Sequence, residues 1–388
     1  MINNPTFAPA TGFKLALETS VNEYFQRAGI ARTGNLATYM KAALALAWLA
    51  ASYYLMVFRV TGWPGGILTG LSLALAMTAV AFNIQHDGNH GSFSRHAWIN
   101  RLAGATLDLL GCSSYLWVWK HNFSHHTYTN IDGVDEDIDM SPFLRLSPGT
   151  PPRRRYRYQH IYGFFAYSLA MLFWVFVKDY KYFLKRDLGP FRNRHNPPRE
   201  VAVLVVTKLL HYGWTIVLPL MVLRIHWWQF LIGYLAMSLT AGAILGLIFQ
   251  LAHVVEGTDY PLPDAEGAME HTWLVHQMMT TSNFAPRNLL LSWYVGGLNY
   301  QIEHHLFPKV CSVHYPAVSR VVRQAAAAHG VPYHEQPTLL RAIRSHYRML
   351  KHFGREAGSD ASGKQGLQIC APPRRPSANT IASPLPQA

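Results

Sequence analysis

The sequence contains few charged residues for its length. Only 14% of its 388 residues are Asp, Glu, Lys or Arg, whereas charged residues make up about 25% of a typical soluble domain. Half of the residues are hydrophobic, and aromatic side chains are common, with 11 Trp and 20 Tyr. This composition excludes an ordinary soluble domain and indicates a membrane protein with sizeable polar parts.

Acidic residues and cysteines are also scarce. There are 21 acidic residues against 34 Lys and Arg, which gives a formal net charge of +13. Because the basic residues lie beside apolar segments, lipid headgroups and a positive-inside topology explain this excess better than nucleic-acid binding does. The three cysteines, Cys112, Cys311 and Cys370, form no CxxC pair, so we expect reduced thiols.

A cleavable signal peptide is not expected either. The first 40 residues are mixed and polar, without a basic stretch followed by an apolar one. We interpret residues 1–40 as a cytoplasmic N-terminal arm and residues 41–353 as the main domain. The tail, residues 354–388, is rich in Gly, Ser, Pro and Ala, and we expect it to be disordered.

Four apolar segments are long enough to cross the hydrocarbon core of a bilayer, which needs about 20 residues. They cover residues 42–60, 67–85, 201–223 and 227–251. Short polar turns join the first segment to the second and the third to the fourth. The sequence therefore predicts an all-α integral membrane protein with four transmembrane helices in two hairpins, together with interfacial helices and a cytoplasmic helical cap.

Two further apolar segments are expected not to cross the membrane. Residues 103–119 contain Asp108 and two glycines, so we interpret them as an interfacial or half-buried helix. Residues 161–177 are apolar enough to span, but clusters of Arg and Lys lie on both sides of them. Because both flanks favour the cytoplasm, this segment is predicted to lie in the interface.

Three clusters of histidine carry the chemistry. They are His86-Asp87-Gly88-Asn89-His90, His121-Asn122-Phe123-Ser124-His125-His126 and Gln301-Ile302-Glu303-His304-His305. In an α-helix, residues four apart share one face, whereas His126 would point about 100° away from His125. One such pair is common by chance, but three beside apolar segments indicate a metal site.

The number of histidines suggests two metal ions. Neutral imidazole is a good ligand for iron, copper and zinc, and a tetrahedral zinc ion takes four ligands. The clusters contain seven histidines, and His253, which follows the fourth span, is the natural eighth. By itself His253 is equally well interpreted as a buried structural residue, and the remaining histidines are interpreted as ordinary core or surface residues.

The position of the clusters constrains the topology. A single centre requires all three clusters on one face of the membrane, and four spans in two hairpins satisfy this requirement. A fifth span at residues 161–177 would place the third cluster opposite the second. Either residues 161–177 lie in the interface, with all clusters next to the ends of the spans on the cytoplasmic side, or the interpretation as a single centre is wrong.

The residues alone leave several functions open. A histidine-bound iron pair at a membrane face favours oxygen activation on a lipid, and either an alkene or an alcohol can result. A non-enzymatic alternative is a histidine-lined metal transporter or sensor. A transporter places polar ligands along a path at mid-membrane, whereas these clusters lie at or beyond the ends of the spans.

The motifs HDGNH, HNFSHH and QIEHHLFP, in this order and at these separations, resemble the membrane fatty acid desaturases. The resemblance is strongest to the group whose third motif begins with Gln, which includes front-end desaturases and bacterial acyl-CoA or linoleoyl-CoA desaturases. It runs from about residue 40 to residue 353 and includes Trp119-Lys120, Thr129-Asn130 and Asp135. QIEHHLFP is highly specific, whereas a bare HxxxH is weak.

The resemblance implies a fatty acid desaturase with two non-haem iron ions, O2 as co-substrate and a CoA- or lipid-linked acyl substrate. The implied location is a bacterial inner membrane, with the active site on the cytoplasmic side. The implied metal ligands are His86, His90, His121, His125, His126, His253, Gln301, His304 and His305. Gln301 is either a weak ligand or a hydrogen-bond partner. Asp87, Asn89, Asp137 and Asn283 either orient imidazoles or serve as ordinary capping and loop residues.

One departure from many front-end relatives concerns the electron supply. Those relatives carry a fused cytochrome b5 domain with an HPGG motif, whereas Trp63-Pro64-Gly65-Gly66 here lacks the His and lies in a membrane turn. The resemblance therefore implies an external electron donor, either a ferredoxin or a flavin- and iron–sulfur-containing reductase. The basic segments at 153–157 and 178–194 either dock such a donor or an acyl-CoA phosphate, or simply follow the positive-inside rule.

Overall fold

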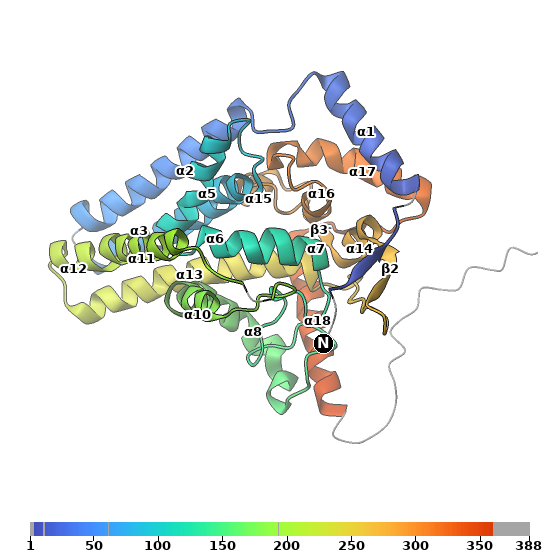
Figure 1. The fold of residues 1–388 in the computed structure, drawn as a ribbon. Helices are drawn as coiled ribbons and strands as arrows, with labels where there is room; N and C mark the ends of the chain where they lie inside the picture. Colours follow the sequence, from blue (N-terminus) through green and yellow to red (C-terminus); the bar gives the residue numbers. More distant parts are fainter. Residues whose placement is uncertain (1–3, 11, 61, 193, 360–388) are drawn as a thin grey trace, which may run out of the picture.

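The structure is a computed structural model that describes residues 4–10, 12–60, 62–192 and 194–359. A bundle of long helices lies on the left in Figure 1, and a cap of shorter helices with two small sheets lies on the right. The disorder predicted for residues 360–388 falls outside the described residues. The first residues assigned to that tail belong to a helix, α18 (Leu339–Ser359).

The four predicted transmembrane helices are confirmed. Among the described residues, four continuous helical segments are long and apolar enough to cross a membrane: Leu36–Arg59, Trp63–His90, Pro198–Val222 and Trp227–His253. They consist of α2 (Leu36–Tyr54), η1 (Leu55–Arg59), α3 (Trp63–Val80), η2 (Ala81–Gln85), α4 (His86–His90), α11 (Pro198–Tyr212), η6 (Gly213–Val217), α12 (Leu218–Val222) and α13 (Trp227–His253).

The second span is the centre of the bundle. Of its 18-residue apolar stretch, 67% is buried inside the protein, against 28% for the first span and 22% for the third. Helix α3 packs against both α2 and α13, and small residues such as Ala74 and Ala76 allow this close approach. The outer spans leave large apolar side chains exposed, including Leu44 and Leu209, as expected of helices that face lipid.

A bent pair of helices packs along α13. The elements are η4 (Arg154–Tyr158), α8 (Gln159–Ser168), α9 (Ala170–Phe173), η5 (Trp174–Lys178) and α10 (Asp179–Leu184). The two halves, Arg154–Ser168 and Ala170–Leu184, meet at 56°. At the bend a Cβ atom on Gly242 would lie 2.2 Å from the Ser168 carbonyl oxygen, so glycine permits this close contact with α13. The bend is compatible with a broken span or a re-entrant segment, and the predicted interfacial position remains a prediction.

The helix predicted over residues 103–119 is interrupted in the structure, so its predicted bounds are wrong. The structure has α5 (Ala97–Leu109), α6 (Ser114–Trp117) and then the π-helical segment η3 (Val118–His125). Gly111 has a φ of +87°, which stops α5, and the Ser113 side chain caps α6 by accepting a hydrogen bond from the Leu116 amide. Two short helices with a turn between them therefore lead into the second histidine cluster.

A buried ion pair holds this turn. Lys208 on α11 lies 2.9 Å from Asp179 on α10, and its ammonium group also donates to the carbonyls of Gly111 and Val175. Asp179 in turn accepts from the Ser113 amide. Because three oxygen acceptors surround the buried ammonium, the charge is compensated inside the protein, and α11, the turn and the bent pair are joined.

The cap includes part of the N-terminal arm. Its elements are β1 (Thr6–Ala8), α1 (Gly12–Ala28), β2 (Ala268–Thr272), α14 (Trp273–Thr280), β3 (Ser282–Phe284), α15 (Leu289–Tyr294), α16 (Gln301–Leu306), η7 (Ser312–His314), α17 (Tyr315–His329), β4 (His334–Gln336) and α18, with α7 (His126–Tyr128) beneath them. Strand β1 pairs with β2 and β3 with β4, both in parallel. Helix α1 packs against α17 and buries Phe13, Leu17, Val21 and Phe25, a stripe with a period of four residues.

We expect cysteines placed at Tyr158 and Lys181 to be labelled from the same side of the membrane, because the bent pair is predicted not to cross it. The test uses a membrane-impermeant maleimide on sealed vesicles of both orientations, in a background where Cys370 is replaced by Ser; Cys112 and Cys311 are buried. A cysteine at His226, between the third and fourth spans, is the control for the opposite side. Labelling of Tyr158→Cys and Lys181→Cys from opposite sides contradicts the prediction.

Candidate metal centre

The first histidine cluster forms the end of the second span. The π-helical segment η2 leads into α4, which carries His86 and His90 and stops where Gly91 adopts a left-handed conformation. Gly88 faces α5 so closely that a Cβ atom would lie 2.5 Å from the Gly104 nitrogen. This contact fixes α4 against α5 and directs both imidazoles into the protein, where each is at most 8% exposed.

The second cluster differs from the predicted α-helix. It lies in η3, where the His126 amide donates to the His121 carbonyl five residues earlier. The wider π-turn returns His126 to the face of His121, and their Nε2 atoms lie 3.2 Å apart. The π-turn therefore brings His126 against His121, instead of the position about 100° round from His125 that an α-helix would give it. Such π-bulges are frequent at functional sites.

The third cluster is held from behind by a buried polar network. The Asn283 side chain accepts a hydrogen bond from the Ile302 amide and donates one to the Glu303 carboxylate. The Tyr333 hydroxyl also donates to Glu303. These contacts anchor α16 in the cap, so that His304 and His305 point away from the network and toward the other clusters.

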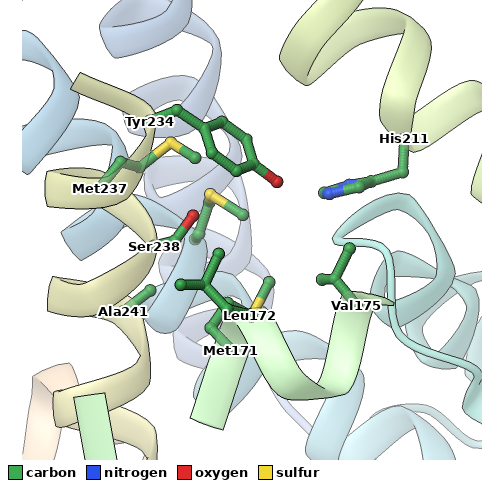
Figure 2. Close-up of a pocket in the computed structure, with 9 residues that line it drawn as sticks. Met171, Leu172, Val175, His211, Tyr234, Met237, Ser238 and Ala241 are labelled. Carbon is green, nitrogen blue, oxygen red and sulfur yellow. The ribbon is translucent and has the colours of Figure 1, made fainter. Parts of the chain in front are cut away.

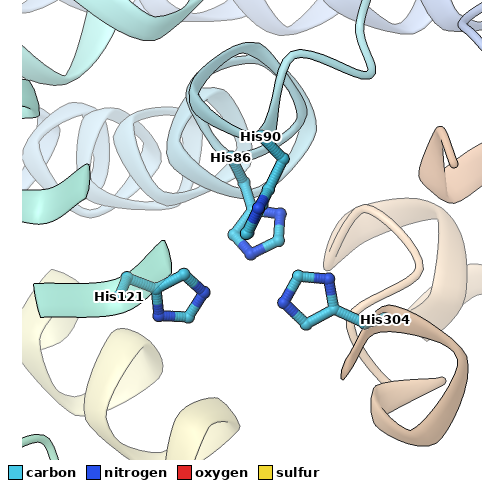
Figure 3. Close-up of side chains that lie close together, drawn as sticks. All are labelled: His86, His90, His121 and His304. Atoms are coloured by element: carbon cyan, nitrogen blue, oxygen red, sulfur yellow. The ribbon is translucent and has the colours of Figure 1, made fainter. Parts of the chain in front are cut away.

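The structure brings all eight predicted histidines together in two adjoining groups. In the first group, the ligand atoms of His86, His90, His121 and His304 all lie within 4.8 Å of one another, and their rings converge on one point in Figure 3. In the second group, the ligand atoms of His125, His253 and His305 also lie within 4.8 Å of one another. His126 lies between the groups and approaches both His304 and His305. None of the remaining histidines in the described ranges joins these groups.

Several buried ring nitrogens in these groups have no hydrogen-bond partner among the described residues. They are His86 Nδ1, His90 Nε2, His125 Nε2, His126 Nδ1, His253 Nε2 and His305 Nε2. A buried polar group without a partner is costly and therefore rare. Metal ligation would satisfy these nitrogens, so the residues fit a two-metal centre.

The opposite nitrogens of several rings are held by protein groups. Nδ1 of His125 lies 2.9 Å from the Asp135 carboxylate, and Nδ1 of His305 lies 2.8 Å from the Gln277 side-chain oxygen. When each Nδ1 carries the proton, Nε2 keeps its lone pair for a metal. These contacts therefore set the tautomer and the direction of each ring.

For most of the rings that lie outside the spans, burial lowers the pKa and so favours the neutral imidazole. It lowers the pKa of His121 to about 3 and holds the pKa values of His126, His304 and His305 well below the ordinary value. Burial also disfavours the charged form of His125, but the Asp135 carboxylate outweighs this effect and raises the pKa of that ring. Neutral imidazole is the form that binds metal.

The four residues expected to orient imidazoles behave differently from one another. Asp137 lies 3.9 Å from His121 Nδ1 and pairs with Lys120, and Asp87 lies 4.0 Å from His86 Nδ1. Among the described contacts, Asn89 and Asn283 bond to no imidazole and instead fix neighbouring segments.

The partners that hold the rings most closely are not among these four residues. They are Asp135, Gln277, Tyr315 and the carbonyl of Thr280, which lies 3.4 Å from His253 Nδ1. Asn130 adds support, because its side-chain amide donates to the carbonyls of His253 and Thr280. Among them, Asp135 and Asn130 carry a signal in the sequence, because both belong to the segment after the second cluster that resembles the desaturases.

Gln301 lies beside the centre. It is buried, and its amide nitrogen donates to the Leu298 carbonyl. Its two predicted roles, weak metal ligand or hydrogen-bond partner, both remain predictions.

A cavity of about 430 Å³ adjoins the histidine groups. Its wall includes His86, His121 and Gln301, and most of the remaining wall is apolar. Exposed residues at its rim mark the opening: Asp139, Ser141, Phe143, Leu169, Phe173 and Lys181. Ligand sites are commonly apolar clefts with a few polar groups, and this cavity can hold a long apolar chain against the histidines.

These features define a helical membrane protein whose candidate two-metal centre opens into an apolar cavity. The chain belongs to the fatty acid desaturase family, because the family model described as Fatty acid desaturase matches residues 61–337. It is 36% identical to the sn-1 linoleoyl-lipid 6-desaturase of Synechocystis sp. over 90% of this chain and 97% of that protein. It is 35% identical to the enzyme of the same name from Arthrospira platensis (89% and 94%), and 37% identical to an acyl-lipid (8-3)-desaturase of Physcomitrium patens (88% and 72%).

We expect His125→Ala and His305→Ala each to abolish stable metal binding while leaving membrane insertion intact, because each removes a ligand from the second group. The metal content per polypeptide is measured in the purified protein by inductively coupled plasma mass spectrometry. His96→Ala, at an exposed histidine, is the control and should keep the wild-type content. Full metal content in both test variants contradicts the assignment.

A milder effect is expected for Asp135→Asn. The amide lacks the charge that holds His125, and loss of such a supporting group lowers metal affinity by about 10- to 100-fold. Chelator titration of the purified protein measures this affinity. Asp264→Asn is the matched control, because Asp264 is exposed and accepts a hydrogen bond from the Ala268 amide instead of from an imidazole. Equal affinities for Asp135→Asn and the control contradict the role given to Asp135.

Proposed function

We propose that this protein is an O2-dependent desaturase that acts on the acyl chains of membrane lipids at two histidine-bound iron ions. The observation that carries the proposal is the pair of adjoining histidine groups on the wall of an apolar cavity. His86, His90, His121, His126 and His304 would hold one ion, and His125, His253 and His305 the other, with His126 between them. The two bound ions would supply O2 activation and hydrogen removal from an unactivated methylene.

The protein contributes position and a dry environment. Trp117 stacks on the His121 ring with centroids 4.3 Å apart and lines the cavity beside it. It would therefore contact the acyl chain next to the first group. The apolar wall excludes water from the reacting carbons. The hydrogen bonds from Asp135 and Gln277 would keep the imidazoles fixed while the chain is bound.

The rim of the cavity supports a lipid-linked substrate. Phe143, Leu169 and Phe173 are 58%, 39% and 42% exposed and lie at the opening with Lys181. Apolar side chains next to a lysine suit the boundary between acyl chains and headgroups, so an acyl chain could enter sideways from the bilayer. The names of the relatives, which act on linoleoyl-lipid or acyl-lipid, support the same substrate class and a new double bond toward the carboxyl end.

Electrons would come from a separate ferredoxin or reductase at the cytoplasmic face of a bacterial inner membrane. The exposed arginines at 153–155 and 157, next to α18 with its own exposed Arg344 and Arg348, form a basic surface on the cap side. Such a surface would attract an acidic donor protein at short range.

The test is a fatty acid profile by gas chromatography–mass spectrometry. The protein is expressed with a ferredoxin and its reductase in a host without polyunsaturated lipids, which is fed oleic or linoleic acid with and without air. We expect a new air-dependent double bond that is absent with His305→Ala and that arises first in the lipid fraction rather than in the acyl-CoA fraction. A hydroxylated product, or no product from metal-loaded protein, contradicts desaturation. If the new double bond appears in the acyl-CoA fraction before the lipid fraction, the lipid substrate is contradicted.

A further inference from the structure

The blind end of the acyl cavity is formed by three residues on three different elements. Met77 on α3, Met171 on α9 and Ala241 on α13 line it, and each is at most 5% exposed. Met77 precedes His86 by nine residues, which corresponds to about 13 Å along a helix. Met77 and Ala241 therefore lie deep in the bundle, away from the metal centre, and the buried Met171 lies between the exposed Leu169 and Phe173.

A second, much smaller cavity of about 10 Å³ lies behind these three residues. Met77, Met171 and Ala241 line both cavities and form the partition between them. Figure 2 shows the second cavity: Tyr234, Met237 and Ser238 line it from α13, and His211 lies across from the Tyr234 hydroxyl. We call this space the rear chamber.

The rear chamber is more polar than the partition. Its wall includes the Tyr234 hydroxyl, the Ser238 hydroxyl and the His211 ring, whose Nδ1 already contacts the Leu109 carbonyl. A methyl terminus that entered the chamber would displace any polar partner of these groups without replacing it. The end of an acyl chain therefore stops most favourably against the partition.

The wall behind the partition is held in place. Lys208 donates to the Val175 carbonyl at 2.7 Å and pairs with Asp179, both on the segment that follows Met171. Gly111 approaches His211 so closely that a Cβ atom would lie 2.6 Å from the ring. Because these contacts fix the backbone on this side, a longer chain would have to move the methionine side chains, which are flexible, rather than the helices.

We propose that Met171, together with Met77 and Ala241, sets the longest methyl-end segment that the enzyme accepts beyond the metal centre. This inference rests on the proposed function, because it takes the cavity as the acyl site. The carboxyl end of the substrate stays at the part of the rim formed by Asp139 and Ser141, close in sequence to Asp137 beside His121, so each carbon added to a chain lies at the partition. The volume of these three side chains is then the specificity determinant.

The test is a competition between acyl chains of eighteen, twenty and twenty-two carbons that share the same carboxyl-side double bonds. Product ratios are measured in one sample by mass spectrometry, so differences in expression cancel. Met171→Ala should raise the ratio of long to short products about tenfold or more, since one methylene in an apolar pocket is worth about 10- to 200-fold in selectivity. Ala241→Val should lower the ratio, because it fills the end of the cavity.

Two controls separate this effect from general damage. Met237→Ala removes the same side chain from the rear chamber but not from the partition, and it should keep the wild-type ratio. Met171→Leu conserves volume and should also keep it. The inference is overturned if both Met171→Ala and Ala241→Val keep the wild-type ratio of long to short products. If Met171→Ala does not insert into the membrane, a wild-type ratio in Ala241→Val alone overturns it. Absence of product from the wild-type protein contradicts the proposed function instead.

Discussion

The buried ring nitrogens of the histidine clusters impose the constraint on which the rest of the structure depends. Six of them have no hydrogen-bond partner among the described residues, and each unsatisfied buried group costs about 1–3 kcal/mol. Bound metal would offset this cost, but only if the rings converge to within a few ångströms. The π-turn of η3, the Gly88 contact that seats α4 and the network behind α16 all serve this convergence.

The membrane spans supply the frame for that centre. Two of the four spans end in candidate ligands, α4 with His90 and α13 with His253, while the cap contributes α16. An even number of spans returns the chain to one side each time, so clusters more than 170 residues apart in sequence can meet at one place. The cap then closes over them, with α1 packed against α17 and the supporting groups Gln277 and Tyr315 bonded to the rings beneath.

The proposed acyl cavity and the candidate metal centre share their walls. α3 and α13 line the cavity and lead to the histidines, so the same two helices position both the chain and the ligands. The bent pair closes one side of the cavity, and the buried Lys208–Asp179 pair ties it to the third span. An enzyme that removes hydrogen from one methylene among many similar ones needs such a rigid wall, because position along the chain is the only property that distinguishes them.

Much of this architecture could be predicted from the sequence, because hydrophobic length and residue type are local properties. The four spans, the three clusters and the candidacy of His253 follow from them, and the even number of spans follows from the need for one centre. The sequence could not reveal the π-turn that returns His126 to His121, the break of residues 103–119 at Gly111, or the role of α1 in the cap. It also could not pair His125 with His253 and His305, or His305 with Gln277. These features depend on contacts between residues far apart in the chain, and only the packing of the helices decides which of many similar side chains meet.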